Sequence, residues 1–187
     1  IADGENSAVR AVNTTTSPLT VANLPLGPGE IRTIAGRGSD GFSGDGGSSI
    51  GSYMYHPHGM ALSQDGLLYI ADRNNCLIRA VNIGTTDITV AGVTISPGAI
   101  NRVVGNSTAT CGFGGDGQPS TDTTVRLYWP YDIALSSDNV LYISDTYNNQ
   151  RIRAVNMGTA DVTVAGVTIP GNTITTIAGT GTGSYTG

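Results

Sequence analysis

The sequence contains no lysine and few charged residues of either sign, which excludes several kinds of binding surface. All nine basic residues are arginines, and charged residues make up 12% of the chain, against about 25% in typical soluble domains. Nucleic-acid surfaces require clustered lysine and arginine, so the net charge of −5 argues against a nucleic-acid partner. No apolar run approaches the roughly 18 residues that a membrane helix needs, so no membrane insertion is expected.

Residues with catalytic or metal-binding chemistry are equally scarce. The chain has two histidines and two cysteines, and it contains no Gly-x-Ser-x-Gly elbow, no Cys–His pairing and no phosphate-binding loop. The sequence therefore assigns no catalytic residue and no cofactor. Glycine, in contrast, is abundant at 27 residues. Threonine, valine and isoleucine are also frequent, and the hydrophobic residues do not recur with the period of a helix. This composition is typical of short strands separated by tight turns.

Internal repetition organises nearly the whole chain. The opening block IADGENSAVRAVN recurs twice, the block IRTIAG recurs twice, and two further blocks, GFSGDG and HPHGMALSQDGLLYIAD, each recur once. The first block occupies 1–13, 70–82 and 143–156; the second 31–36, 100–105 and 174–179; the third 41–46 and 112–117; the fourth 56–72 and 129–145. Each complete unit predicts four short strands, which in the first unit span 59–62, 67–71, 77–81 and 100–104.

Four antiparallel strands repeated in tandem predict an all-β fold with about two and a half blades of a β-propeller, or an open propeller-like array. The expected units are half a blade, two complete blades and the start of a further loop. The half blade, with the third and fourth strands and an insertion, covers 1–36; the complete blades cover 37–105 and 106–179; the loop covers 180–187.

The recurring strings resemble the NHL-repeat β-propeller family in a long-repeat form of about 70 residues. The resemblance rests on the pattern Pro-x-Gly-x-Ala-Leu-x-x-Asp-Gly-x-Leu-Tyr-Ile-Ala-Asp at 57–72 and on IRTIAGRGSDGFSGDGG at 31–47. It implies a propeller fold. It leaves the activity open, because this architecture carries lyases, lactonases, protein-binding modules and adhesive modules.

Two threonine-rich insertions, 83–99 and 157–173, lengthen the repeat between its third and fourth strands. Their alternating pattern predicts an extra hairpin or strand on the outer edge of each blade. One interpretation is a decorative loop. The other is a surface for lateral assembly, in which the backbones of Thr89–Thr94 and Thr163–Thr168 pair outside their own blade, since uncharged edges are templates for pairing.

Four side chains at the start of the first strands are candidates for a binding rim: His56, His58, Trp129 and Tyr131. The alternate spacing of the two histidines also suits a metal, although a structural role is the simpler interpretation. The repeated residues Asp72, Asp145, Arg79 and Arg153 are interpreted as structural contacts that recur in each blade.

Two glycine-rich loops carry one carboxylate each, Asp45 and Asp116. The simpler interpretation is a compact turn with a phenylalanine packed between blades. The alternative is a weak calcium site, because calcium prefers oxygen ligands but requires six to eight of them.

Cys76 and Cys111 are expected in loops on the same face of a blade, and we interpret them as a disulfide, with two free thiols as the alternative. The sequons at Asn13 and Asn106 predict N-glycosylation. Both features favour an extracellular or cell-surface location.

These observations favour a structural or adhesive repeat module of a larger surface protein or fibre. Its expected partners are other repeats of the same chain, copies of itself, other surface proteins or glycans. The alternative is a fragment of a propeller enzyme, a lyase or lactonase, whose catalytic residues lie outside residues 1–187.

Overall fold

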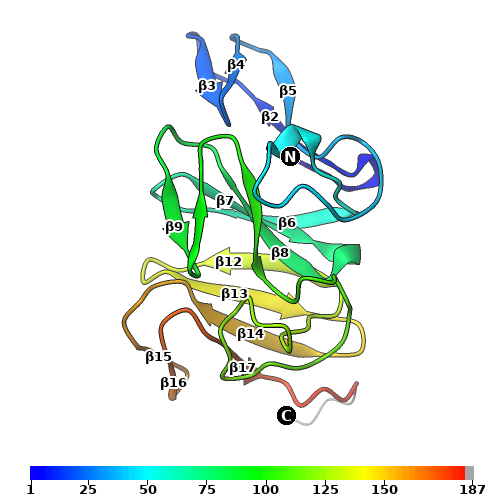
Figure 1. Ribbon diagram of the computed structural model, residues 1–187, viewed down its shortest axis with the longest axis vertical. Helices are drawn as coiled ribbons and strands as arrows, with labels where there is room; N and C mark the ends of the chain where they lie inside the picture. The colour runs from blue at the N-terminus through cyan, green and yellow to red at the C-terminus, as the bar shows by residue number, and fades with distance from the viewer. Residues whose placement is uncertain (184–187) are drawn as a thin grey trace.

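The computed structural model describes residues 1–183, and its three larger β-sheets are stacked along the long axis of the molecule (Figure 1). We call them blades 1, 2 and 3. Blade 1 contains β1 (Ala2–Asp3), β2 (Ala8–Val12) and β5 (Ile31–Ala35). Blade 2 contains β6 (Pro57–Leu62), β7 (Leu67–Asp72), β8 (Leu77–Asn82) and β11 (Ile100–Val104). Blade 3 contains β12 (Pro130–Leu135), β13 (Val140–Asp145), β14 (Arg151–Asn156) and β17 (Ile174–Ala178).

Every strand pair in these sheets is antiparallel, which confirms the predicted all-β fold of four-stranded blades. The predicted fourth strand, 100–104, has the bounds that the structure shows, and β6 begins two residues before its predicted start. Three short 3-10 turns accompany the strands: η1 (Gly4–Asn6), η2 (Ser49–Gly51) and η3 (Arg73–Asn75). The predicted segment 180–187 extends beyond the described residues, so its assignment to a further loop stays a prediction.

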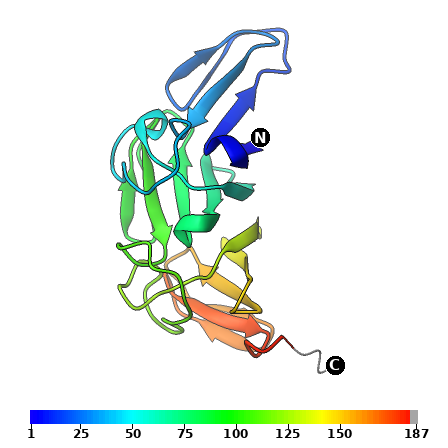
Figure 2. The ribbon, with the colours of Figure 1, turned by 90° about the vertical axis from the view of Figure 1, so that its right-hand side faces the viewer.

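The core lies between the blades, which follow one another along an arc (Figure 2). We call the face of a blade that is turned towards the following blade its trailing face, and the opposite one its leading face. Val9 and Ala35 on the trailing face of blade 1 belong to one buried cluster with Ile70, Val81 and Ile100 of blade 2. A second cluster joins the trailing face of blade 2 to blade 3 in the same way. Each blade is therefore stabilised by burial against its neighbour.

Each insertion forms a two-stranded hairpin on the outer side of its blade. The pairs are β3 (Leu19–Val21) with β4 (Leu24–Leu26), β9 (Ile88–Val90) with β10 (Val93–Ile95), and β15 (Val162–Val164) with β16 (Val167–Ile169). In the second hairpin Thr89 pairs with Thr94, and the tip residues Ala91 and Gly92 both have positive φ, 50° and 72°. This is the geometry of a type I′ turn, which favours a local hairpin.

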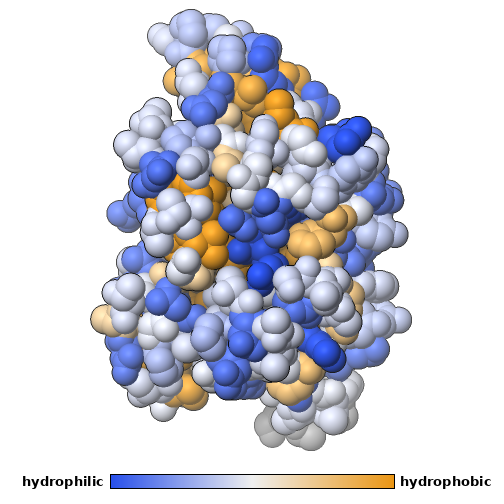
Figure 3. All heavy atoms as spheres, viewed as in Figure 1, coloured by the Kyte–Doolittle hydropathy of each residue, from blue (hydrophilic) through white to orange (hydrophobic). Residues whose placement is uncertain are grey.

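The expectation that these threonine segments pair outside their own blade is therefore wrong. In the third hairpin as well, Thr163 pairs with Thr168 of the same hairpin. Contact with the next blade comes instead from the hairpin tips. The backbone N–H of Ala22 donates to the carbonyl of Ile83 at 3.4 Å, and the Asn23 amide donates to the carbonyl of Pro97 at 2.8 Å. On the face of the molecule shown in Figure 3, hydrophobic side chains form small patches that are separated by hydrophilic residues and residues of intermediate hydropathy.

A serine in each connecting loop ties the loop to the last strand of the preceding blade. Ser49 Oγ donates to the carbonyl of Ile34 at 2.6 Å, and its own carbonyl accepts from Gly36 N–H at 2.9 Å. Ser120 makes the same two bonds to Val103 and Gly105. Gly36 has φ +80°, and a Cβ there would lie 2.3 Å from the Ser7 carbonyl oxygen, so this close approach requires glycine.

The predicted disulfide between Cys76 and Cys111 is confirmed, with Cα atoms 5.2 Å apart. It joins the turn after η3 in blade 2 to the loop that leads to blade 3. At the equivalent place between blades 1 and 2, Ser7 Oγ donates to the carboxylate of Asp40. The same contact between neighbouring blades is therefore made once by a hydrogen bond and once by a covalent bond.

Candidate binding rim

The sharp turns that precede β6 and β12 place aromatic side chains at one end of the first strands. His56 and Trp129 adopt the left-handed conformation, with φ of 50° and 49°, and a proline follows each of them. Residues other than glycine rarely adopt this conformation, so the surrounding structure must hold it. A buried carboxylate does so in both blades.

Asp72 fixes the turn in blade 2 from within the core. Its Oδ1 accepts from Tyr55 N–H at 2.8 Å, its Oδ2 accepts from the Asn75 amide at 2.9 Å, and Arg79 Nη1 lies 3.6 Å away. Asp145 makes the equivalent bonds in blade 3, including one from Tyr128 N–H at 2.6 Å. Burial raises the pKa of the Asp72 carboxyl to about 6, against the opposing effect of the Arg79 charge, and it also raises the pKa of Asp145.

The two glycine-rich loops are held by buried arginines. Arg79 is fully buried; its Nη2 lies 2.7 Å from Asp45 and donates to the Ser43 carbonyl at 3.0 Å, while its Nη1 donates to the Tyr53 carbonyl at 2.8 Å. In blade 3, Arg153 Nη2 lies 2.7 Å from Asp116.

Both calcium candidates, Asp45 and Asp116, thus already have a cation as partner. Within residues 1–183, no group of three or more His, Cys, Asp or Glu side chains is arranged to hold a metal ion. The phenylalanine expected to pack between blades is Phe42 in the first of these loops and Phe113 in the second. Phe113 is 45% exposed, and the Arg151 guanidinium lies 3.8 Å from the centre of its ring.

The rim itself is a continuous series of ring contacts between blades 2 and 3. The rings of His58 and Tyr131 have centroids 4.1 Å apart. The Arg73 guanidinium lies 4.5 Å from the Trp129 ring and 5.8 Å from the Tyr131 ring. Trp129 continues to Tyr147, with centroids 4.4 Å apart. Tyr131 is 47% exposed and Tyr147 is 52% exposed, so the series ends on open aromatic surface at both blades.

Three of the four predicted rim residues come together: His58, Trp129 and Tyr131. His56 lies aside, with its ring 5.4 Å from that of Tyr55 and its Nδ1 3.5 Å from Glu5. Burial, and next the charge of Arg73, lower the pKa of His58.

Sequence reasoning missed Arg73 and Tyr147, which complete the rim. The signal for Tyr147 was the one-residue insertion that distinguishes ISDTYNNQRIRAVN from the corresponding block of blade 2. Arg73 lies in η3 and has no arginine counterpart in blade 3, so the repeat pattern gave no reason to choose it.

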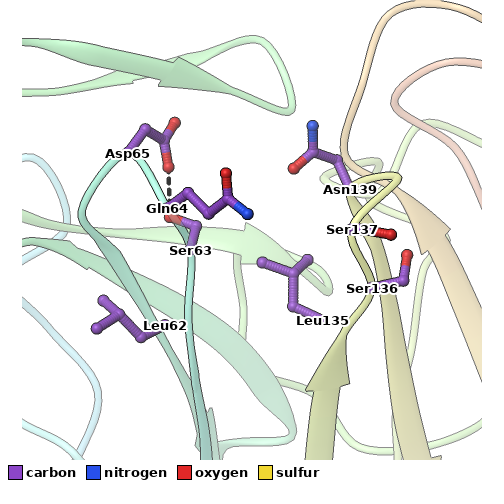
Figure 4. A pocket seen from close by; sticks show the side chains of 8 residues that line it. All are labelled: Leu62, Ser63, Gln64, Asp65, Leu135, Ser136, Ser137 and Asn139. Atoms are coloured by element: carbon purple, nitrogen blue, oxygen red, sulfur yellow. Dashed lines mark hydrogen bonds between the residues drawn. The ribbon is translucent and has the colours of Figure 1, made fainter.

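A pocket of about 460 Å³ lies at the other end of the same strands, between the turns that follow β6 and β12 (Figure 4). Leu62 and Leu135 contribute apolar surface, and Gln64 and Asn139 stand on opposite sides of the space. Ser63 Oγ donates to the Asp65 carboxylate within this lining. The lining thus combines amide and hydroxyl groups with the Asp65 carboxylate.

Both predicted glycosylation sites are buried in the structure, and glycosylation there stays a prediction. Asn13 is fully buried, and its Nδ2 donates to the carbonyls of Ser17 at 2.8 Å and Leu26 at 3.0 Å. Asn106 is 3% exposed, and its Nδ2 donates to Thr110 and Val125. A glycan on Nδ2 would remove one of these donors and require space inside the blade.

The sequence model of the family described as Teneurin NHL domain matches residues 32–173, about three quarters of the chain. Among curated proteins, the mouse protein Teneurin-3 is 31% identical over 109 residues, which cover 54% of this chain and 3% of that protein. The chain thus corresponds to a small part of this relative. None of the helices in residues 1–183 is long and apolar enough to cross a membrane.

Proposed function

Because the chain belongs to the teneurin NHL-domain family, we propose that it is an extracellular binding module of a larger cell-surface protein. Two features support an extracellular place: the similarity to part of Teneurin-3, and the disulfide between Cys76 and Cys111. Disulfides persist in oxidising compartments and are rare in the cytosol. The repeated blades act as the rigid scaffold that presents a binding surface.

The main support for this proposal is the rim, the series of aromatic side chains between blades 2 and 3. Tyrosine, tryptophan and arginine are the residues that most often dominate the binding energy of protein interfaces. Here Tyr131, Trp129, Arg73 and Tyr147 are contiguous, and the outer two are half exposed. The turn that carries Trp129 is fixed by bonds from Tyr128 N–H to Asp145 and from Thr146 Oγ1 to the Trp129 carbonyl.

This rigidity reduces the entropy that is lost when a partner binds. The proposed partner is a protein of another cell surface or of the extracellular matrix, bound with Tyr131 and Tyr147 at the centre of the contact. A glycan is the second candidate, because exposed tyrosine rings also stack on sugar rings.

The test uses the purified chain, multimerised on a fluorescent carrier, as a probe of intact cells. The double variant Tyr131→Ala/Tyr147→Ala removes the exposed rings, and Leu19→Ala, in the β3–β4 hairpin of blade 1 and 41% exposed, serves as the matched control. We expect the double variant to lose binding by about 30-fold or more, which corresponds to the loss of one hot spot, and the control to bind normally.

Treatment of the cells distinguishes the two partner classes. Loss of binding after mild trypsin treatment supports a protein partner, whereas loss after glycosidase treatment alone supports a glycan. Equal binding of the double variant and the wild-type chain would contradict a role for the rim. The absence of binding by the wild-type chain to every cell type tested would contradict the proposal as a whole.

A further inference from the structure

The disulfide between Cys76 and Cys111 connects the two halves of the binding rim. On the side of blade 2, Cys76 follows η3, the turn that carries Arg73, and its N–H donates to the Arg73 carbonyl at 3.0 Å. Cys76 has φ +58° and is 1% exposed, so it ends this turn in a fixed, buried place. The disulfide is therefore attached to the same turn as the guanidinium that lies on the Trp129 ring.

On the side of blade 3, Gly112, which follows the second cysteine, holds both segments that carry the aromatic rings. Its N–H donates to the carbonyl of Leu127 at 2.9 Å, shortly before Trp129 in the chain. Its carbonyl accepts from the Asn149 amide at 2.8 Å, shortly after Tyr147. The second half of the disulfide is thus connected, through one peptide unit, to the backbone on both sides of the ring contact.

The hydrogen bonds of η3, in contrast, hold it to blade 2 alone. Asn74 N–H donates to the Tyr55 carbonyl at 3.0 Å, and the Asn75 amide donates to the Gly41 carbonyl at 2.7 Å. Within residues 1–183, no hydrogen bond joins η3 or Cys76 to blade 3 or to the loop that leads to it. The disulfide is therefore the bond that keeps η3 beside blade 3.

The junction between blades 1 and 2 has neither the disulfide nor the arginine. Gly4 of η1 takes the repeat position of Arg73. The contact between the blades is here the hydrogen bond from Ser7 Oγ to the Asp40 carboxylate. The covalent bond thus occurs at the junction where the turn carries an arginine for the rim, and a hydrogen bond suffices where the turn carries a glycine.

We propose that the disulfide positions Arg73 on Trp129, and that its reduction lowers the affinity of the rim for its partner. This inference rests on the binding function proposed for the rim. Once the bond is open, η3 is held by blade 2 alone, and the guanidinium loses its fixed place over the ring. The rim then loses part of the preorganisation that reduces the entropic cost of binding.

The reductant is an external dithiol. Its thiolate attacks the sulfur of Cys111, which is half-buried, and Cys76 leaves as a thiolate and is protonated. The second thiol of the reagent then attacks the mixed disulfide and releases Cys111 as a thiol. The products are two protein thiols and one cyclic disulfide, so the reagent has lost the two electrons that the protein gained.

Fluorescence tests the positioning role without any partner, because Trp129 is the only tryptophan in the chain. The oxidised chain is compared with Cys76→Ser/Cys111→Ser and with the wild-type chain reduced by dithiothreitol and then reoxidised. Without the disulfide, we expect tryptophan emission at longer wavelength and stronger quenching by acrylamide, because the guanidinium no longer covers the ring. In the Arg73→Gln background, removal of the disulfide should leave the signal unchanged.

A relocated disulfide separates positioning from a general loss of stability. Ser7→Cys/Asp40→Cys, added to the serine variant, places a covalent bond at the equivalent contact between blades 1 and 2, away from the rim. Circular dichroism and thiol titration establish that this chain retains its strands and forms the new bond. Its Trp129 emission should stay shifted, as in the serine variant.

The cell-binding assay tests the consequence for affinity. We expect the chain with the relocated bond to bind about tenfold more weakly than the oxidised wild-type chain. Equal binding of the two would overturn the proposal, and so would equal Trp129 emission with and without the disulfide. A shift that persists in the Arg73→Gln background, or that the relocated bond reverses, would overturn it as well. Absence of binding by the wild-type chain would contradict the proposed function, whereas the fluorescence would still decide the positioning role.

Discussion

The buried carboxyl group of Asp72 gives the stability of this fold a defined dependence on pH. Asp72 is fully buried, and it accepts hydrogen bonds from Tyr55 N–H and the Asn75 amide. Burial raises its pKa from 3.8 to about 6 although Arg79 Nη1 lies 3.6 Å away. The free-energy cost of desolvating the carboxylate is therefore larger than the stabilisation that the Arg79 charge provides. The substitution Asp72→Asn removes the titration but keeps the shape and one acceptor oxygen.

The sign of the effect follows from the direction of the shift. Because its pKa is higher in the folded state, Asp72 binds a proton more tightly there than in the unfolded chain. Its contribution to stability is complete below about pH 4 and is lost as the pH rises through 6. A shift of about two pKa units corresponds to about 3 kcal/mol. Relative to Asp72→Asn, the wild-type chain should thus lose up to about 3 kcal/mol of unfolding free energy between pH 4 and pH 7.5.

Urea unfolding at half-unit pH intervals, with the disulfide kept oxidised, measures this difference directly. Asp87→Asn, at an exposed aspartate near the second hairpin, is the matched control and should give a curve parallel to that of the wild-type chain. If the Asp72→Asn curve is also parallel, Asp72 stays ionised throughout and the Arg79 charge outweighs the cost of burial. That result would refute the reasoning.

Two further predictions concern contacts that join or support the blades. Replacing Cys76 and Cys111 by serine should lower the free energy of unfolding by about 4 kcal/mol, because their disulfide closes a loop of 35 residues. Denaturant unfolding of this variant and of the oxidised wild-type chain measures the difference. Asn82→Ala should lower the free energy of unfolding by about 1–3 kcal/mol, because Asn82 Nδ2 donates to the carbonyls of Thr86 and Ile95, both at 2.7 Å. Backbone hydrogen exchange should become faster in the β9–β10 hairpin and stay unchanged in β7.

The repeats made the architecture predictable because each strand recurs at the same place in the unit. The segment 100–104, for example, resembles 31–35 and 174–178 in sequence, and each of the three forms the last strand of its blade. The disulfide followed from the same logic, because two loops on one face of a blade bring Cys76 and Cys111 together. The rim was only partly predictable, since Arg73 and Tyr147 are departures from the repeat.

The two sequons lie at buried positions, which the local motif does not reveal. The sequon at Asn13 has the same role as Asn82 and Asn156, which lie at the same position of the repeat and are not sequons. All three asparagines donate Nδ2 bonds to carbonyls at the base of the outer hairpin, at positions four and thirteen residues ahead. Thr15, which completes the sequon at Asn13, donates from its N–H at 2.9 Å and from its Oγ1 at 2.8 Å to Asn13 Oδ1. A local motif carries no information on exposure, which is set by contacts across the blade.

Residues that recur in every blade, such as Arg79 and Arg153, are engaged with the fold, and their repetition identifies structural contacts. Residues that break the repeat, such as Arg73 and Tyr147, lie together in the rim, which favours a role in binding. Departures from the repeat thus indicate the binding rim.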